Sequence, residues 1–134
     1  MPGYSGTPLT KKLGIKPNFI LYVKNPPTNY KELVSPLPEN VTIRTRLVSN
    51  LDMIHLFTKS RKELCQLIEK LSSKIKPNGM IWISWPKKAS KVPTDITENV
   101  LREVILPMGL VDIKVCAVDE TWSGLKFVIR KENR

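Results

Sequence analysis

Residues 80–85 read Met-Ile-Trp-Ile-Ser-Trp, and this apolar run constrains the fold more than any other stretch of the sequence. A strand with one face in water alternates apolar and polar residues, whereas a strand covered on both faces is apolar at nearly every position. The run therefore predicts a central strand of a parallel sheet that has helices on both sides. Residues 76–79 before it, Lys-Pro-Asn-Gly, are typical of a turn, and Pro86 and two lysines end the run.

Apolar segments of strand and helix length alternate along the rest of the chain. Strands are predicted at residues 19–23, 41–47, 51–57, 111–118 and 125–129, with 41–47 at an edge because two arginines alternate with its apolar residues. The first predicted helix begins at Pro8, with Thr7 as its N-cap, and ends at Gly14, and a second, short helix is predicted over residues 29–34. Two further helices each follow a capping box: one begins after Ser60, and the other covers residues 96–106 after Asp95. This order predicts one Rossmann-like α/β domain over residues 1–134, a three-layer and mainly parallel sheet with a C-terminal antiparallel hairpin.

Composition sets further limits on the class of protein. The chain of 134 residues is long enough for a core, but it has no apolar run of the roughly 18 residues that a membrane helix needs. Its N-terminus lacks the order of a signal peptide, so a soluble, cytoplasmic protein is expected. Cys65 and Cys116 lie within apolar patterns without metal-site spacing, so both are expected to be buried thiols and no metal site is predicted.

The formal net charge of +10 favours an anionic ligand, an acidic protein or nucleic acid as partner. Lys and Arg are spread from Lys11 to Arg134, however, which is typical of a solvated surface rather than of one binding face. No helix-turn-helix, RNA-recognition or zinc-finger signature supports nucleic acid binding. Trp85 and Trp122 could stack on the bases of a single strand near the lysines after residue 86, but packing at the rim of the sheet is the favoured explanation for both.

Polar residues cluster in the sequence where two predicted strands end. Lys87 and Lys88 follow the central strand, and residues 119–124 join the last two strands. Ligands of parallel sheets bind outside the carboxyl ends of the strands, so both segments are expected at one edge, beside a helix N-terminus at Thr94 and Asp95. The candidate ligand-binding residues are Trp85, Lys87, Lys88, Lys91, Thr94, Asp95, Asp119, Glu120, Trp122 and Ser123. Alternatively, these charges only pair with one another and cap the helix.

His55 is the sole histidine and lies inside the predicted strand 51–57. A catalytic histidine needs a nucleophile or a substrate proton within hydrogen-bond reach, and no Ser or Cys with such a context stands nearby in the sequence. A hydrogen-bonded histidine in the core or at an interface is therefore expected.

Several segments resemble landmarks of class I S-adenosylmethionine-dependent methyltransferases, namely residues 13–17, 51–57, 75–82 and the closing hairpin. The resemblance implies a Rossmann-like fold. It also implies a glycine-rich loop after the first strand, but residues 24–28 here read Lys-Asn-Pro-Pro-Thr. An acidic residue is likewise expected at the end of the second strand, where residues 45–48 read Thr-Arg-Leu-Val. An intact cofactor site is therefore not expected, and no cofactor is predicted.

At finer grain, residues 4–14, 84–88, 94–95 and 118–125 resemble a family of small bacterial proteins that is catalogued only as a domain of unknown function. This resemblance covers the full chain and implies no activity.

Two hypotheses of function follow. The first is a non-enzymatic binding or regulatory module on a degenerate methyltransferase-like scaffold, with an anionic ligand at the basic rim. The second is an enzyme, either an aberrant S-adenosylmethionine-dependent methyltransferase or an unknown chemistry where Lys87 meets Asp119. Binding is favoured, because the sequence offers no recognisable nucleophile, metal set or acid/base pair.

Overall fold

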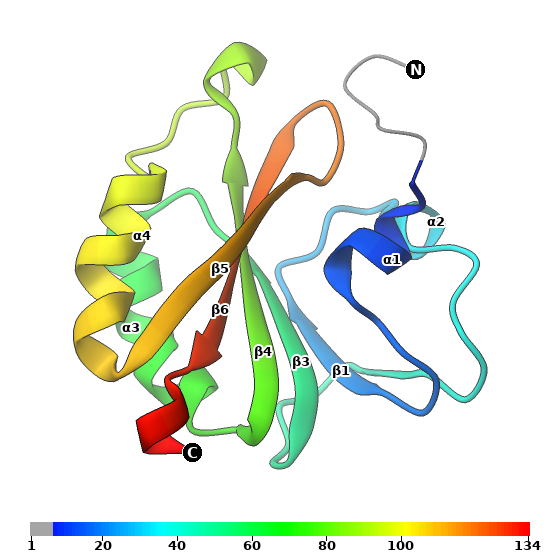
Figure 1. Cartoon of the computed structure of the whole chain (residues 1–134). Helices are drawn as coiled ribbons and strands as arrows, with labels where there is room; N and C mark the ends of the chain where they lie inside the picture. Colours follow the sequence, from blue (N-terminus) through cyan, green and yellow to red (C-terminus); the bar gives the residue numbers. More distant parts are fainter. Residues whose placement is uncertain (1–6) are drawn as a thin grey trace.

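The computed structural model of the chain describes residues 7–134, so residues 4–6 of the second resemblance lie outside the described part. Its centre is one sheet in the order β2-β1-β3-β4-β6-β5 (Figure 1). The strands are β1 (Ile20–Lys24), β2 (Thr42–Arg44), β3 (Leu51–Phe57), β4 (Ile75–Pro86), β5 (Leu110–Ala117) and β6 (Trp122–Ile129). The helices are α1 (Leu9–Leu13), α2 (Tyr30–Leu33), α3 (Arg61–Ser72) and α4 (Glu98–Ile105), with short 3-10 turns η1 (Lys88–Ser90), η2 (Leu106–Met108) and η3 (Lys131–Asn133).

The strand pairing confirms the predicted mainly parallel sheet with an antiparallel C-terminal hairpin. β1 pairs in parallel with β2 and β3, and β3 pairs in parallel with β4. β6 is antiparallel to both β4 and β5, so β5 forms one edge and β2 the other. The edge position predicted for the strand around Ile43 is thus confirmed, although β2 is only three residues long.

Helices cover the sheet on both sides, as the apolar run predicts. α3 and α4 lie on one face, and α1 and α2 lie on the other (Figure 1). Leu64 of α3 and Leu101 of α4 are fully buried and belong to the same core cluster as Ile81 of β4. On the opposite face, the indole Nε1 of Trp82 donates to the carbonyl oxygen of Leu13 at 2.9 Å, which fixes α1 on the sheet.

β4 is the central strand, and it is longer than predicted. Residues 80–86 are all buried, which is the reason for their apolar sequence. The predicted turn at residues 76–79 is wrong, because these residues belong to β4 and form an irregularity in its pairing with β3. Leu51 is opposite Ile75 whereas Met53 is opposite Met80. Between these two pairs β3 has one residue and β4 has several, so the extra residues of β4 have no partner in β3, as in a β-bulge.

Several other element boundaries differ from the predicted ones by a few residues. α1 begins at Leu9 with Pro8 as its N-cap residue, one position later than expected, and ends as predicted at Gly14, which has a φ of 83°. α4 begins at Glu98, because the side chain of Thr97 rather than that of Asp95 caps it. The link between β5 and β6 is shorter than residues 119–124, since β6 already begins at Trp122.

The two thiols differ in exposure. Cys116 is buried as predicted, but Cys65 is exposed on the outer side of α3, so the prediction for Cys65 is wrong. Its neighbours Leu64 and Ile68 occupy the buried side of the helix, and the helical repeat turns residue 65 away from the sheet. Among residues 7–134, no helix is long and apolar enough to cross a membrane.

Candidate ligand-binding site

The order of the strands reverses between β1 and β3. The chain passes from β1 to β2 on one side and then crosses to β3 on the other side before it continues to β4. In open α/β sheets, the crevice at the carboxyl ends of the strands next to such a reversal is the usual ligand site. The loop after β1, which holds Asn25, Pro26 and Pro27, lies at this crevice. It separates two cavities, and its prolines line both of them.

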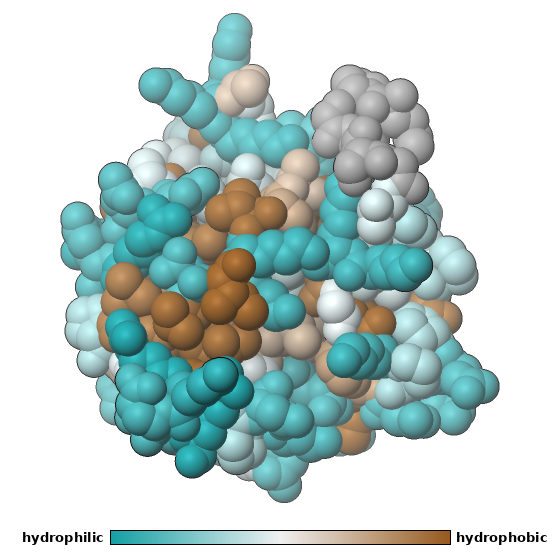
Figure 2. Space-filling view, viewed as in Figure 1, coloured by the Kyte–Doolittle hydropathy of each residue, from teal (hydrophilic) through white to brown (hydrophobic). Residues whose placement is uncertain are grey.

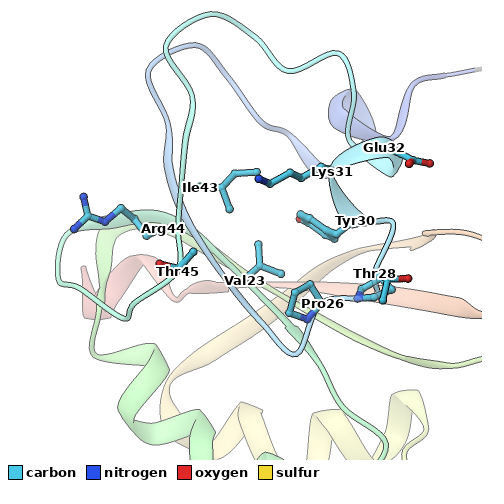
Figure 3. Close-up of a pocket in the computed structure, with 10 residues that line it drawn as sticks. Val23, Pro26, Thr28, Tyr30, Lys31, Glu32, Ile43, Arg44 and Thr45 are labelled. Atoms are coloured by element: carbon cyan, nitrogen blue, oxygen red, sulfur yellow. The ribbon is translucent and has the colours of Figure 1, made fainter.

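The first cavity lies between the carboxyl ends of β1 and β2 and has a volume of about 610 Å³. This is within the range of about 300 to 1,000 Å³ that is common for small-molecule sites. Figure 3 shows Val23, Tyr30 and Pro26 as its walls, with Lys31 reaching across it toward Ile43. Glu32 and the guanidinium of Arg44 point away from its centre (Figure 3). The cavity thus has mainly apolar walls, with Lys31 extending across it and Glu32 and Arg44 at its edges.

The second cavity, of about 450 Å³, lies between the loop after β1 and the end of β3. Its lining is Asn25, Pro26, Pro27, Phe57, Thr58, Lys59, Ser60, Glu63 and Trp122. The Glu63 carboxylate accepts a hydrogen bond of 2.6 Å from the Thr58 hydroxyl and one of 3.4 Å from the Asn25 amide. The Asn25 amide also donates to the carbonyl oxygen of Phe57 at 3.2 Å, so side chains of the protein itself bridge the crevice.

His55 lies behind the first cavity and is fully buried, which confirms the predicted core histidine. Its Nδ1 is 3.0 Å from the hydroxyl of Tyr30, and its Nε2 is 2.7 Å from the hydroxyl of Ser84. Burial lowers the pKa of His55 to about 3 and raises the pKa of Tyr30, so both groups are neutral near pH 7. The network therefore fixes the Tyr30 ring that forms one wall of the cavity.

The predicted meeting of the two polar segments at one sheet edge is confirmed. The backbone N–H of Lys87 donates to the carbonyl oxygen of Thr121 at 2.7 Å, and Pro86 pairs with Trp122. Asp119 does not bind the lysines in the structure: its Oδ1 accepts the backbone N–H groups of Thr121 and Trp122 at 2.8 Å each. It therefore shapes its own turn, which explains why β6 begins earlier than predicted. Exposed Glu120 belongs to the same turn.

Trp85 and Trp122 lie on opposite faces of the sheet. Trp85 is opposite Ser123 in the antiparallel pairing, and Pro86 is opposite Trp122, so the two indoles alternate between the faces. Trp85 is buried in the cluster under α3 and α4, whereas Trp122 stacks edge-on against Phe57 with 5.1 Å between ring centroids. Because the two indoles lie on opposite faces, they form no single stacking surface, which agrees with the packing at the rim that is favoured for both.

Thr94 and Asp95 hold the N-terminus of α3, not that of α4. Asp95 Oδ1 accepts the backbone N–H of Arg61 at 2.7 Å, and the Thr94 hydroxyl donates to the carbonyl oxygen of Lys59 at 2.7 Å. These side chains were expected to mark backbone amides available to a ligand. Instead, the Asp95 carboxylate itself occupies the N-terminus of a neighbouring helix.

Several other predicted residues line a third cavity, of about 570 Å³, on the α4 side of β4. Trp85, Lys88, Lys91 and Thr94 lie there, together with Glu98. Of the ten predicted residues, four line this cavity, Trp122 lines the second one, and Asp119 and Glu120 form the turn. Lys87, Asp95 and Ser123 belong to none of these three places. Sequence reasoning missed the first cavity, although the proline pair that lines it is visible in the sequence, because prolines were interpreted only as obstacles to the cofactor.

No family model matches the sequence, and no curated protein is similar to it in sequence. Solved structures of methyltransferases do share the fold. An S-adenosylmethionine-dependent methyltransferase from Aquifex aeolicus aligns with a TM-score of 0.64 and 15% identity, over 90% of this chain and 87% of that chain. Magnesium protoporphyrin IX methyltransferase from Synechocystis PCC 6803 aligns with a TM-score of 0.64 and 11% identity, over 91% and 74%. Aeropyrum pernix fibrillarin aligns with a TM-score of 0.57 and 13% identity, over 94% of this chain and 70% of that chain. The chain has the class I methyltransferase fold.

The residues at the reversal of strand order do not fit S-adenosylmethionine, the cofactor that this fold implies. The loop after β1 contains no glycine, and its Pro26 and Pro27 have no backbone N–H to donate. Asn25 makes the turn with a φ of 57°, and its side chain occupies the crevice through the contacts described above. At the end of β2, Arg44 and Thr45 stand where a carboxylate would accept the ribose hydroxyls.

Proposed function

We propose that this protein is a non-enzymatic binding module on a methyltransferase-like scaffold, and that it holds a small anionic molecule in the cavity between β1 and β2. One observation carries the proposal: this cavity is walled by apolar and aromatic side chains, and Lys31 and Arg44 stand at its rim. An apolar body can lie against Val23 and Tyr30 while a phosphate or carboxylate reaches the cations.

The charges around the cavity favour an anion over a cation such as a sulfonium. Lys31 and Arg44 are both exposed and can turn toward a ligand without unfolding any element. Glu32 points away from the centre, as does the guanidinium of Arg44 (Figure 3), so the lining carries two cations and one carboxylate. Glu63 in the neighbouring cavity is already engaged by Thr58 and Asn25. The reachable charge at this crevice is thus mainly positive.

A titration with matched uncharged analogues tests the proposal. Isothermal calorimetry is carried out with adenosine monophosphate and adenosine, and with pyrophosphate as an anion without an apolar body. We expect the phosphorylated nucleotide to bind most tightly, because it uses both the walls and the rim. In the double variant Lys31→Gln/Arg44→Gln its affinity should fall about tenfold or more, since a hydrogen bond to a charged group contributes about 1.5 to 3 kcal/mol.

The control is the double variant Lys88→Gln/Lys91→Gln, which removes the same charge at the third cavity. Its affinity should match that of the unchanged protein. If this control loses affinity while the Lys31/Arg44 variant keeps it, the ligand binds at the third cavity and the proposal is wrong. The same conclusion holds if adenosine binds as well as its phosphate.

The second candidate is a methyltransferase, and the fold shared with enzymes of that class favours it. Glu32 lines the first cavity, so a different side-chain conformation could offer a carboxylate to the ribose hydroxyls of the cofactor. The candidate predicts a specific affinity for S-adenosylmethionine, which separates it from the binding module.

A further inference from the structure

Four lysines from separate parts of the chain meet on the sheet face that carries α1. Lys114 of β5 and Lys126 of β6 are paired across the strands, so their side chains leave the same face. Lys126 Nζ lies close to α1, within 3.5 Å of the position that a Cβ on Gly14 would take. Lys11 of α1 and Lys114 line one open cavity of about 400 Å³. Lys16 follows α1, and we call these four residues the lysine face.

The lysine face is built from segments without carboxylates. Residues 7–16, 113–118 and 121–131 contain no Asp or Glu. The ion pairs found among residues 7–134 involve none of the four lysines: they join Arg61 to Glu103, Arg102 to Glu98 and to Asp112 at the start of β5, and Lys76 to Asp52. The α3 and α4 side thus carries charges of both signs in pairs, whereas the three segments that form the lysine face carry only positive charge.

Like charges on this face act on one another. Burial lowers the pKa of Lys126, and the neighbouring charges of Lys114 and Lys16 lower it further. The Lys114 ammonium is held at its place by a hydrogen bond of 3.0 Å to the carbonyl oxygen of Lys12. Figure 2 shows hydrophilic side chains that extend from β5 toward α1 on this side of the molecule. A polyanion laid along them would relieve the mutual repulsion.

We propose that the lysine face binds the phosphodiester backbone of single-stranded nucleic acid, independently of base sequence. Lysine is a compact point charge that suits phosphates, whereas it is depleted at the centres of protein–protein interfaces. Among residues 7–134, those that line the cavity between Lys11 and Lys114 include no aromatic side chain, so the proposed contact is with phosphates rather than with stacked bases. The lysines come from three segments, which lets one strand touch several of them in succession.

The salt dependence of binding tests this proposal. Fluorescence anisotropy of a fluorescein-labelled 20-nucleotide oligouridylate is measured with the full chain at several salt concentrations between about 50 and 200 mM, where phosphate contacts dominate affinity. The variant Lys16→Gln/Lys114→Gln should reduce the slope of log K against log salt by about 1.4, because each lost contact to a single-stranded phosphate removes about 0.7.

The matched control is Lys62→Gln/Lys70→Gln, which removes two exposed lysines from α3 on the other side of the sheet. Its slope should equal that of the unchanged protein, and circular dichroism checks that both variants are folded. The proposal is overturned if both variants lose slope equally, if no binding occurs at the lowest salt, or if a 20-residue polyglutamate competes as well as unlabelled oligouridylate.

Discussion

At the residue scale, the buried contacts of His55 connect the wall of the proposed site to the middle of the sheet. Tyr30 belongs to α2, His55 to β3 and Ser84 to β4, and hydrogen bonds of 3.0 and 2.7 Å join them in that order. The sequence predicted a hydrogen-bonded histidine because no nucleophile stood near it. It could not identify Tyr30 or Ser84 as the partners, since both are more than twenty residues away in the chain.

The pKa of His55 predicts how stability depends on pH. Burial lowers this pKa from 6.5 to about 3, so the folded protein keeps His55 neutral where the unfolded chain binds a proton. Unfolding therefore takes up a proton below about pH 6.5, and the free energy of unfolding should fall as the pH falls, by at most about 1.4 kcal/mol per pH unit. Above pH 6.5 this contribution is complete and constant.

Urea denaturation at pH 7, 6 and 5 measures the effect. The variant His55→Gln lacks the histidine that takes up this proton, so its free energy of unfolding should fall less between pH 7 and pH 5 than that of the unchanged protein. The variant is less stable at every pH, because its buried contacts are altered. Parallel pH profiles for the two proteins would contradict the prediction.

At the element scale, the N-terminus of α3 is held by a residue 34 positions away. The Ser60 hydroxyl accepts the backbone N–H of Glu63, as the predicted capping box requires. The Glu63 carboxylate turns to Thr58 and Asn25 instead of completing the box. The Thr58 hydroxyl accepts the N–H of Ser60 in its place, and Asp95 accepts the next N–H, that of Arg61. The sequence placed Asp95 at α4 because local spacing alone cannot distinguish two overlapping caps, at Asp95 and at Thr97.

Removal of this contact should destabilise the fold. We expect Asp95→Ala to lower the free energy of unfolding by about 1 kcal/mol, since it removes a helix N-terminal acceptor and a favourable charge. The control Glu103→Ala breaks only an exposed ion pair to Arg61, which should contribute less than about 0.5 kcal/mol. Urea denaturation at pH 7 compares the two variants. Equal losses would mean that Asp95 contributes no more than a surface charge.

At the scale of the whole molecule, the sheet was predictable because each central strand is apolar on both faces. β3 has the predicted bounds, Leu51–Phe57, and β4 contains the predicted run. The charge distribution was not predictable in this way. Lys11 is far from Lys114 and Lys126 in the sequence, and the spread of lysines along the chain indicates a solvated surface. The packing of α1 beside the β5–β6 hairpin is what brings the three to one face.

The position of the proposed site also depends on topology. The sequence identified the loop after β1 as unsuited to the cofactor, because proline and the absence of glycine are local properties. It placed the ligand at the rim after Trp85, however, while the largest described cavity at a reversal of strand order lies beside Pro26 and Pro27. Side chains from β1, β2 and α2 form that cavity together, so no single motif marks it.

We infer that this methyltransferase-like fold lacks the methyltransferase cofactor site. Calorimetric titration of the full chain with S-adenosylmethionine and S-adenosylhomocysteine tests it most directly. We predict no saturable binding of either compound, because Asn25 fills the crevice, Pro26 and Pro27 offer no donors, and Arg44 stands at the end of β2. A dissociation constant below roughly 10 μM for either compound, equivalent to about −7 kcal/mol of specific contact, would contradict the claim.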